Sequence, residues 1–286
     1  MPRSNYEYPG YEKSGTRYYV RAFLLYTILV VGAVWMLMPF WFTITTALTK
    51  NPTAATMDIF PSEVTLVNFQ DVIRKVPVGK WFFNSLLLAT TATLFNLVFD
   101  SLAGYALGKL DFWGNGKLFL AFISTMMVPG IVTLIPVYIM LTKLGWVNTY
   151  QGLLAPFVAS PLGIFLLRQQ YKKLPSSLGD AARMDGCSEF QVFYKIYLPM
   201  TKPSLAALGI FTFIGTWNNF EWPLIIANDS SLYTLPVALF EVRAQFSANW
   251  GLVMAAAALI VIPTIVVFLL AQKQFIKGMT LSGTKG

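Results

Sequence analysis

Residues 174–203 read LPSSLGDAARMDGCSEFQVFYKIYLPMTKP and form a long polar segment between two strongly apolar ones. Ser177 and Asp180 have the spacing of a capping box, which predicts that a short helix begins there. Gly186 favours a left-handed residue that ends this helix. The segment, called the elbow below, is therefore expected to turn sharply at Gly186.

A second helix is expected in the later half of the elbow. Ser188 and Gln191 repeat the capping-box spacing, and aromatic residues follow at helical intervals. Pro199 is expected to end this helix, because proline interrupts the hydrogen-bond ladder. The elbow therefore predicts a helix, a glycine turn and a second helix.

The elbow resembles the EAA signature of the permease subunits of binding-protein-dependent ABC importers. The matching residues are Asp180, Ala181, Ala182, Gly186, Ile196, Leu198 and Pro199. Only Asp180 departs from the signature, where the family has glutamate. The resemblance implies that the first helix is a coupling helix, which lies in a groove on a separate ATP-hydrolysing subunit. The two alanines would offer a small-residue surface to that partner, and the acid would suit the positive end of the helix dipole.

Two other interpretations of the elbow are an ordinary amphipathic loop and a DNA-reading helix-turn-helix. Flanking membrane spans argue against the DNA-binding interpretation.

The 286 residues are 56% hydrophobic and only 12% charged, which is a composition typical of bilayer proteins. The basic residues behind the net charge of +8 fall singly or in pairs between apolar stretches and so indicate topology rather than nucleic-acid binding. Cys187 is the single cysteine and histidine is absent, so neither an internal disulfide nor a metal cluster is expected.

The hydropathy pattern predicts an all-α integral membrane protein with six spans and the elbow on the cytoplasmic side. A cytoplasmic tail (1–21), a transmembrane domain (22–271) and a second cytoplasmic tail (272–286) are expected. The spans are placed at about 22–47, 81–108, 118–141, 152–167, 204–227 and 250–271. External loops are expected at 48–80 and 228–249, and the coupling loop occupies 168–203.

Three features refine this layout. Pro129, Gly130 and Pro136 predict a bent third span that lines a cavity. The fourth span is short for a membrane helix. FPSEVTLVNF at 60–69, followed by Asn84 and Ser85, resembles the corresponding loop and span of the maltose-type carbohydrate permeases.

Lysine and arginine residues support the orientation. Of 21, the expected outer segments hold only Lys50, Arg74, Lys75, Lys80, Lys143 and Arg243. The positive-inside rule then places both termini and the elbow in the cytoplasm.

Polar residues near the end of the fifth span form a candidate translocation path. They are Trp217, Asn218, Asn219, Phe220 and Glu221, and the stretch resembles the W-N-x-F-x-x-P segment of carbohydrate permeases. Amides beside aromatic rings are the groups that a sugar site uses, and buried polar groups in a membrane need partners. The alternative is that Glu221 and the tryptophans lie at the outer membrane interface.

Two polar residues of the second span share one helical face. Asn96 and Asp100 lie four residues apart, with Thr93 on the same side, and Asp100 is expected near the membrane midplane. A role in the path and a purely structural role are both open for Asp100.

The chain offers no nucleotide site of its own. Gly116-Lys117 fails as a P-loop, because Asp111 stands where the first glycine belongs and Leu118 follows the lysine. No cofactor is therefore expected on this chain, and ATP and magnesium are expected on a partner. Near the C-terminus, Phe275, Lys277 and Gly278 resemble the permease tail that reaches the ATPase subunits.

The resemblance implies a permease subunit that imports a carbohydrate by alternating access in a prokaryotic inner membrane. Its expected partners are a second homologous permease, two ATP-binding subunits, an extracytoplasmic sugar-binding protein and the lipid bilayer, with no nucleic acid. A proton-coupled carrier that uses Asp100 and Glu221 is the alternative transporter. A membrane transferase lacks a supporting cluster of acids or nucleophiles.

Overall fold

The computed structural model describes residues 16–50, 52, 59–61 and 63–283, and within them it leaves out the side chains of 16–18 and 270–283. The described chain is helical between its turns. Its β-structure there is limited to an isolated antiparallel bridge between Thr49 and Val64. The all-α prediction is therefore confirmed.

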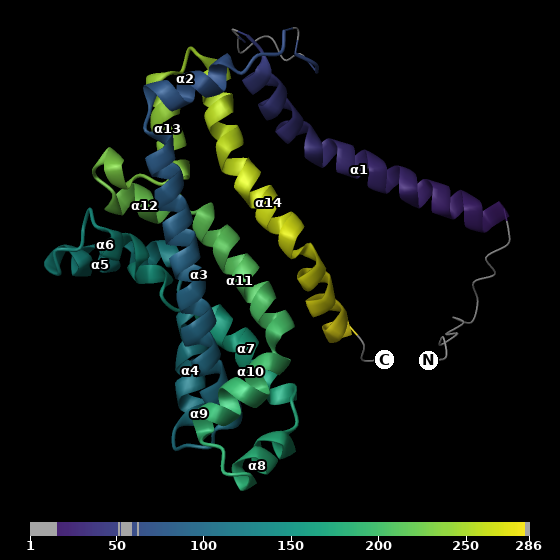
Figure 1. Cartoon of the computed structure of the whole chain (residues 1–286), viewed down its shortest axis with the longest axis vertical. Coiled ribbons are helices and arrows are strands. Elements are labelled where there is room, and N and C mark those ends of the chain that lie inside the picture. The colour runs from purple at the N-terminus through teal and green to yellow at the C-terminus, as the bar shows by residue number, and fades with distance from the viewer. Residues whose placement is uncertain (1–15, 51, 53–58, 62, 284–286) are drawn as a thin grey trace.

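Three helices are long and apolar enough to cross a membrane: α1 (Thr16–Leu48), α3 (Val78–Lys109) and α14 (Trp250–Gly283). They correspond to the first, second and sixth predicted spans. Figure 1 shows α3 running along the bundle, while α1 extends away from it on the far side of α14. Most side chains described on α1 are apolar and exposed.

The third predicted span is a sharply bent pair of helices. α4 (Asn115–Thr125) and α5 (Gly130–Lys143) meet at 99°. The break falls at Pro129, the N-cap residue of α5, because the residue before a proline avoids the helical conformation. The predicted bend is confirmed, and Pro136 lies inside α5.

The fourth predicted span is longer than expected and is also broken. It comprises α6 (Tyr150–Leu154), the 3-10 turn η1 (Ala155–Phe157) and α7 (Pro161–Lys173), with a bend of 41°. Proline at the first turn of α7 lacks the N–H that a continuous helix would need, so a new helix starts there. The sequence pattern predicted a short span at about 152–167 and did not indicate this break.

The fifth predicted span is divided between α11 (Lys202–Trp217) and the short α12 (Glu221–Ile226). By length and composition, three described helices qualify as spans, or five if each bent pair counts as one. α11 has 16 residues and falls below that length. The count of six spans therefore stays a prediction.

The elbow projects from one end of the bundle. It consists of α8 (Ser176–Met184), α9 (Glu189–Gln191), the π-helix η2 (Val192–Tyr197) and α10 (Leu198–Met200). Figure 1 places α8 at the extreme lower end, beyond the ends of α3 and α7.

The opposite end, called the loop end, is built from α2 (Val67–Lys75), η3 (Ser230–Leu232) and α13 (Leu235–Gln245). Asn84 organises it. This buried amide donates to the carbonyl oxygens of Ser231 and Tyr233 and accepts from the hydroxyl of Tyr150, at 2.8–2.9 Å. Ser85 accepts the N–H of Leu235 at 2.8 Å. Asn84 and Ser85 thus fix the segment after α12 to the start of α3.

The core of the bundle is the packing of α3 against α7 and α11, while α14 packs on α11 and α1. The approach of α3 to α7 depends on Gly104. A methyl group there would lie 2.9 Å from the Cβ of Leu167, closer than side chains approach. α3 therefore contacts both α7 and α11, which together with it line the cavity described below.

Candidate functional site

The first helix of the elbow starts without the predicted capping box. α8 begins at Ser176 after Pro175, and no side chain caps it, so Ser177 lies inside the helix rather than at its cap. The carbonyl groups just before α8 accept hydrogen bonds from side chains of α3 and η2. Lys109 donates to the carbonyl oxygen of Leu174, and Tyr197 donates to that of Pro175 at 3.1 Å.

The turn at Gly186 has the predicted geometry. Its φ is +82°, in the left-handed region that favours glycine. The N–H of Gly186 binds the carbonyl of Arg183 and that of Cys187 binds the carbonyl of Ala182, both at 3.0 Å. These two bonds form a Schellman motif and satisfy carbonyl groups that the helix end leaves free.

The second helix also starts as predicted but ends differently. Ser188 and Gln191 form a complete capping box, with bonds of 2.9 and 3.4 Å. The helix then widens into the π-helix η2 and continues through Pro199 to Met200. Pro199 lies in the first turn of α10, where its missing N–H needs no partner. The helix therefore ends at Met200, one residue after the predicted end at Pro199.

The signature residues divide between the surface and the interior of the elbow. Asp180, Ala181, Gly186 and Pro199 are exposed, Ile196 and Leu198 are half-buried, and Ala182 is buried. Only one of the two alanines therefore offers a small surface. Beside it, Met184 is 88% exposed and Phe190 is exposed as well, so the outer face of the elbow is partly apolar.

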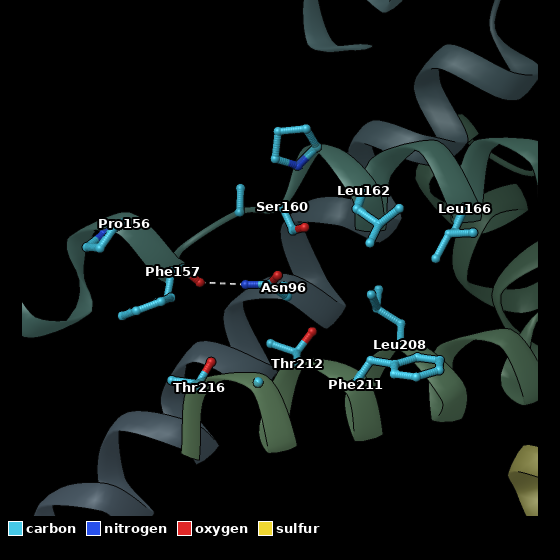
Figure 2. A pocket seen from close by; sticks show the side chains of 13 residues that line it. Asn96, Pro156, Phe157, Ser160, Leu162, Leu166, Leu208, Phe211, Thr212 and Thr216 are labelled. Atoms are coloured by element: carbon cyan, nitrogen blue, oxygen red, sulfur yellow. Dashed lines mark hydrogen bonds between the residues drawn. The ribbon is translucent and has the colours of Figure 1, made fainter. Parts of the chain in front are cut away.

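A cavity of about 470 Å³ lies between α3, α7 and α11 and is open to the surface beside the exposed side chains of Leu162 and Phe211. Its polar lining residues are Asn96, Ser160, Thr212 and Thr216. The remaining lining residues are Pro156, Phe157, Ala159, Pro161, Leu162, Leu166, Leu208, Phe211 and Gly215. Figure 2 shows Thr212 and Thr216 on one helix facing Asn96 and the break before α7 on the other side. The third predicted span was expected to line a cavity, but none of its residues lines this one.

Asn96 and Asp100 hold the two sides of the break in the fourth span. Asn96 donates to the carbonyl oxygen of Phe157, before the break (Figure 2). Asp100 accepts the N–H of Ser160, after the break, at 2.9 Å. Asp100 is fully buried, is not among the lining residues, and its Oδ2 faces the Cα of Gly163 without a hydrogen-bond partner.

The other predicted path residues lie beyond the cavity. Trp217 is 1% exposed, and its indole N–H donates to the carbonyl of Ile260 at 3.1 Å, within the packed core. Asn218 is exposed and donates to the carbonyl of Ile214. Asn219, just before the N-cap residue Phe220, accepts the N–H of Trp222 in the first turn of α12.

Phe220 and Glu221 complete the predicted window. The ring of Phe220 lies 5.8 Å from that of Phe240, and Glu221 is exposed at the start of α12. None of the five window residues lines the 470 Å³ cavity. The hydroxyls of Thr212 and Thr216 were missed, although their spacing of four residues on one face of an apolar helix was a usable signal.

The predicted tail residues Phe275, Lys277 and Gly278 lie in the helical backbone of α14, but their side chains lie outside the described part of the chain. Their contact with an ATPase stays a prediction.

Comparison with known proteins identifies a family and several relatives with similar sequences. The family described as "binding-protein-dependent transport system inner membrane component" matches residues 100–281. The arabinooligosaccharides transport system permease protein AraQ of Bacillus subtilis is 36% identical over 231 residues, 80% of this chain and 82% of that protein. The trehalose/maltose transport system permease protein MalG of Thermococcus litoralis is 32% identical over 269 residues, 91% of this chain and 96% of that protein.

The fold also matches a solved structure. A chain of a bacterial ABC transporter involved in the import of the acidic polysaccharide alginate superposes with a TM-score of 0.83 over 93% of this chain and 100% of that chain, at 21% identity. The elbow, the helical bundle and these matches agree with one another. The chain belongs to the family of inner membrane components of binding-protein-dependent transport systems.

Proposed function

We propose that this chain is a permease subunit of an ATP-driven importer and that it carries an oligosaccharide across the membrane by alternating access. The observation that carries the proposal is the elbow. Its signature residues fold into a short helix and a left-handed turn at the extreme end of the bundle, with a partly apolar outer face. Such a face suits docking on another protein.

The cavity supports a neutral sugar as cargo. Its polar lining consists of one amide and three hydroxyl groups, and the rings of Phe157 and Phe211 lie beside them. These groups hydrogen-bond and stack on sugar rings. Among the described residues no charged side chain lines the cavity, so an acidic sugar would enter without a compensating cation. Relatives named for arabinooligosaccharides, trehalose or maltose and lactose agree with this substrate class.

The subunit is proposed to work with partners. A second permease, of a different sequence, would complete the path. Two ATPase subunits would bind ATP and magnesium and dock on the elbow, and a sugar-binding protein would deliver the cargo at the loop end. This arrangement puts the elbow and both termini on the cytoplasmic side of a prokaryotic inner membrane, in agreement with the distribution of lysine and arginine.

Reconstitution tests the proposal. The chain, its partner permease and the ATPase are placed in proteoliposomes with the binding protein outside, and the import of labelled arabinotriose, maltose and lactose is measured with and without internal ATP. We expect ATP-dependent import of at least one of these neutral sugars, and no import of an acidic uronate trisaccharide. Import driven by a proton gradient without ATP would instead support the secondary carrier.

A further inference from the structure

Arg183 connects the two helices of the elbow across the Gly186 turn. Its Nε and Nη2 atoms donate to the two carboxylate oxygens of Glu189, each at 3.0 Å, and its Nη1 atom donates to Asp180 at 2.8 Å. A two-pronged arginine–carboxylate contact fixes orientation as well as distance. α8 and the start of α9 are therefore held together as one unit.

Tyr105 connects this unit to the bundle. Its hydroxyl donates to Oε1 of Glu189, the same oxygen that Arg183 binds. The tyrosine is 4% exposed, and its ring packs against Tyr171, Phe193 and Tyr197 with centroid distances of 5.1–5.7 Å. Because the ring is enclosed, the position of the hydroxyl is fixed relative to α3.

α3 leads from this contact to the cavity. Tyr105 and Asn96 lie nine residues apart on the same unbroken helix, which corresponds to about 13 Å along its axis. Asn96 lines the cavity and binds the carbonyl of Phe157 beside it (Figure 2). A displacement of the elbow that is transmitted to Tyr105 therefore acts on a helix that forms one cavity wall.

We propose that Glu189 and Tyr105 are positioning residues that transmit movement of the elbow to α3 and, through Asn96, to the cavity. The inference deepens the proposed permease function and rests on it. If the ion pairs only stabilise the elbow, loss of the Tyr105 hydroxyl leaves coupling unchanged, because the contacts between Arg183 and Glu189 remain. The two roles are therefore separable by experiment.

Tyr171 provides a matched control. It belongs to the same buried aromatic cluster, and its hydroxyl makes a hydrogen bond of 2.8 Å with Ser101 and also interacts with Thr201, rather than with Glu189. Tyr105→Phe and Tyr171→Phe each remove one buried hydroxyl and keep the ring. Only the first removes a contact between the bundle and Glu189.

The test uses the reconstituted complex with the sugar that the wild-type complex imports. Sugar imported and ATP hydrolysed are measured in the same vesicles, and their ratio is compared for four variants: Tyr105→Phe, Tyr171→Phe, Glu189→Ala and the double variant Tyr105→Phe/Glu189→Ala. We expect Tyr105→Phe to lower the ratio by about fivefold or more, as for a typical coupling between sites, and Tyr171→Phe to leave it unchanged. The double variant should match Glu189→Ala, because both changes remove the same hydrogen bond.

Three outcomes would overturn the inference: a wild-type ratio in Tyr105→Phe, equal losses in both tyrosine variants, or additive losses in the double variant. Loss of the ATPase from the Tyr105→Phe complex would overturn it as well, because the hydroxyl lies on the bundle side of Glu189. Failure of the proposed function has a different signature, since the wild-type complex would then import no sugar with ATP.

Discussion

Gly186 is the residue whose backbone most directly shapes the elbow. Its φ of +82° strains any residue with a side chain, and a β-branched residue most of all. Apart from Gly186 itself and its two neighbours in sequence, no heavy atom of the described residues lies within 4 Å of the position that a Cβ would take there. A substitution would therefore act through backbone strain and through whatever docks on the elbow, and not through a clash inside the subunit.

Gly186→Val is expected to uncouple ATP hydrolysis from sugar import while the bundle stays folded. The physical reason is strain of about 1–2 kcal/mol at the turn together with a side chain at the docking surface. The measurement is ATPase activity stimulated by loaded binding protein, alongside import.

Asp180→Lys should also uncouple ATP hydrolysis from import, because a cation would then lie on the exposed face of α8 beside Arg183. The same measurement of ATPase activity and import applies.

Gly145 is the matched control for this substitution. It also has a positive φ, +70°, and open space around it, but it lies after α5, far from the elbow in sequence and structure. Gly145→Val should introduce similar strain and leave coupling intact. Equal uncoupling by both variants would mean that the elbow has no special role.

Glu189 gives the elbow a weak dependence on pH. The hydrogen bonds from Arg183 hold the pKa of its carboxyl below the ordinary value of 4.5. A carboxyl with a lowered pKa stabilises the fold above its ordinary pKa, and this contribution is lost as the pH falls through the lower, folded-state value. Because the side chain is 41% exposed, solvent screening limits the contribution to about 1 kcal/mol or less.

The thermal midpoint of the purified subunit in detergent should therefore fall between pH 6 and 3 more steeply for the wild type than for Glu189→Gln. The glutamine variant has no carboxyl to protonate at this position. If the thermal midpoints of the two proteins changed with pH in the same way, the ion pair between Arg183 and Glu189 would not contribute to stability.

Among the elements, α7 is positioned by its contact with α3. Asp100 binds the N–H of Ser160 at the start of α7, and its other oxygen faces Gly163. A methyl group at Gly163 would lie 2.0 Å from that oxygen, whereas one at Gly209 of α11 would meet its nearest neighbour at 3.6 Å. The two glycines thus differ mainly in available space.

Gly163→Ala should destabilise the subunit by about 1–3 kcal/mol, the usual cost of overpacking, and should alter the break beside the cavity. Gly209→Ala should be neutral or slightly stabilising, because alanine favours the helix. The thermal midpoints of the two variants in detergent give the comparison. Equal thermal midpoints would show that the side chain of Asp100 leaves room for a methyl group at Gly163.

α11 and the residue that follows it each offer a candidate for the path. Thr212 lines the cavity, while Asn218 is exposed beyond it. Thr212→Val keeps the shape and removes one hydroxyl, so the half-saturating sugar concentration should rise by roughly two- to tenfold, the equivalent of one hydrogen bond. The measurement is import at graded sugar concentrations, with ATPase binding checked by co-purification.

Asn218→Leu is the companion variant, and the sequence predicts that it impairs import without loss of assembly. If Thr212→Val alone weakens import, the path follows the cavity. If Asn218→Leu alone does so, the path follows the polar window at residues 217–221.

At the scale of the whole molecule, the elbow and the loop end lie at opposite ends of the bundle (Figure 1). The proposed topology puts them on opposite sides of the membrane. Ser177 and Ser230 are exposed positions at the two ends, and Cys187 is the only native cysteine.

In a Cys187→Ser background, Ser230→Cys should be labelled by a membrane-impermeant maleimide from outside intact cells, and Ser177→Cys only after the membrane is opened. Labelling of both positions from the same side would disprove the orientation.

The sequence alone determined the features that depend on neighbouring residues. The left-handed turn at Gly186 and the capping box from Ser188 to Gln191 follow from backbone sterics and spacing within a few residues, so they could be predicted. The apolar helices and the family signature could be predicted for the same reason. The start of α8 was misjudged because the chain just before it is held by Lys109 and Tyr197, which come from other elements and donate to the carbonyl oxygens of Leu174 and Pro175.

Only the tertiary structure decided what the polar residues of the bundle contact. Asp100 and Ser160 are 60 residues apart, and Tyr105 and Glu189 are 84 apart, so no local pattern indicates that they meet. The cavity likewise depends on how α3, α7 and α11 pack, which placed Thr212 and Thr216 in its wall and Trp217 in the core. The reason is physical: helical periodicity specifies which side chains share a face, whereas packing between helices selects the neighbour that each face meets.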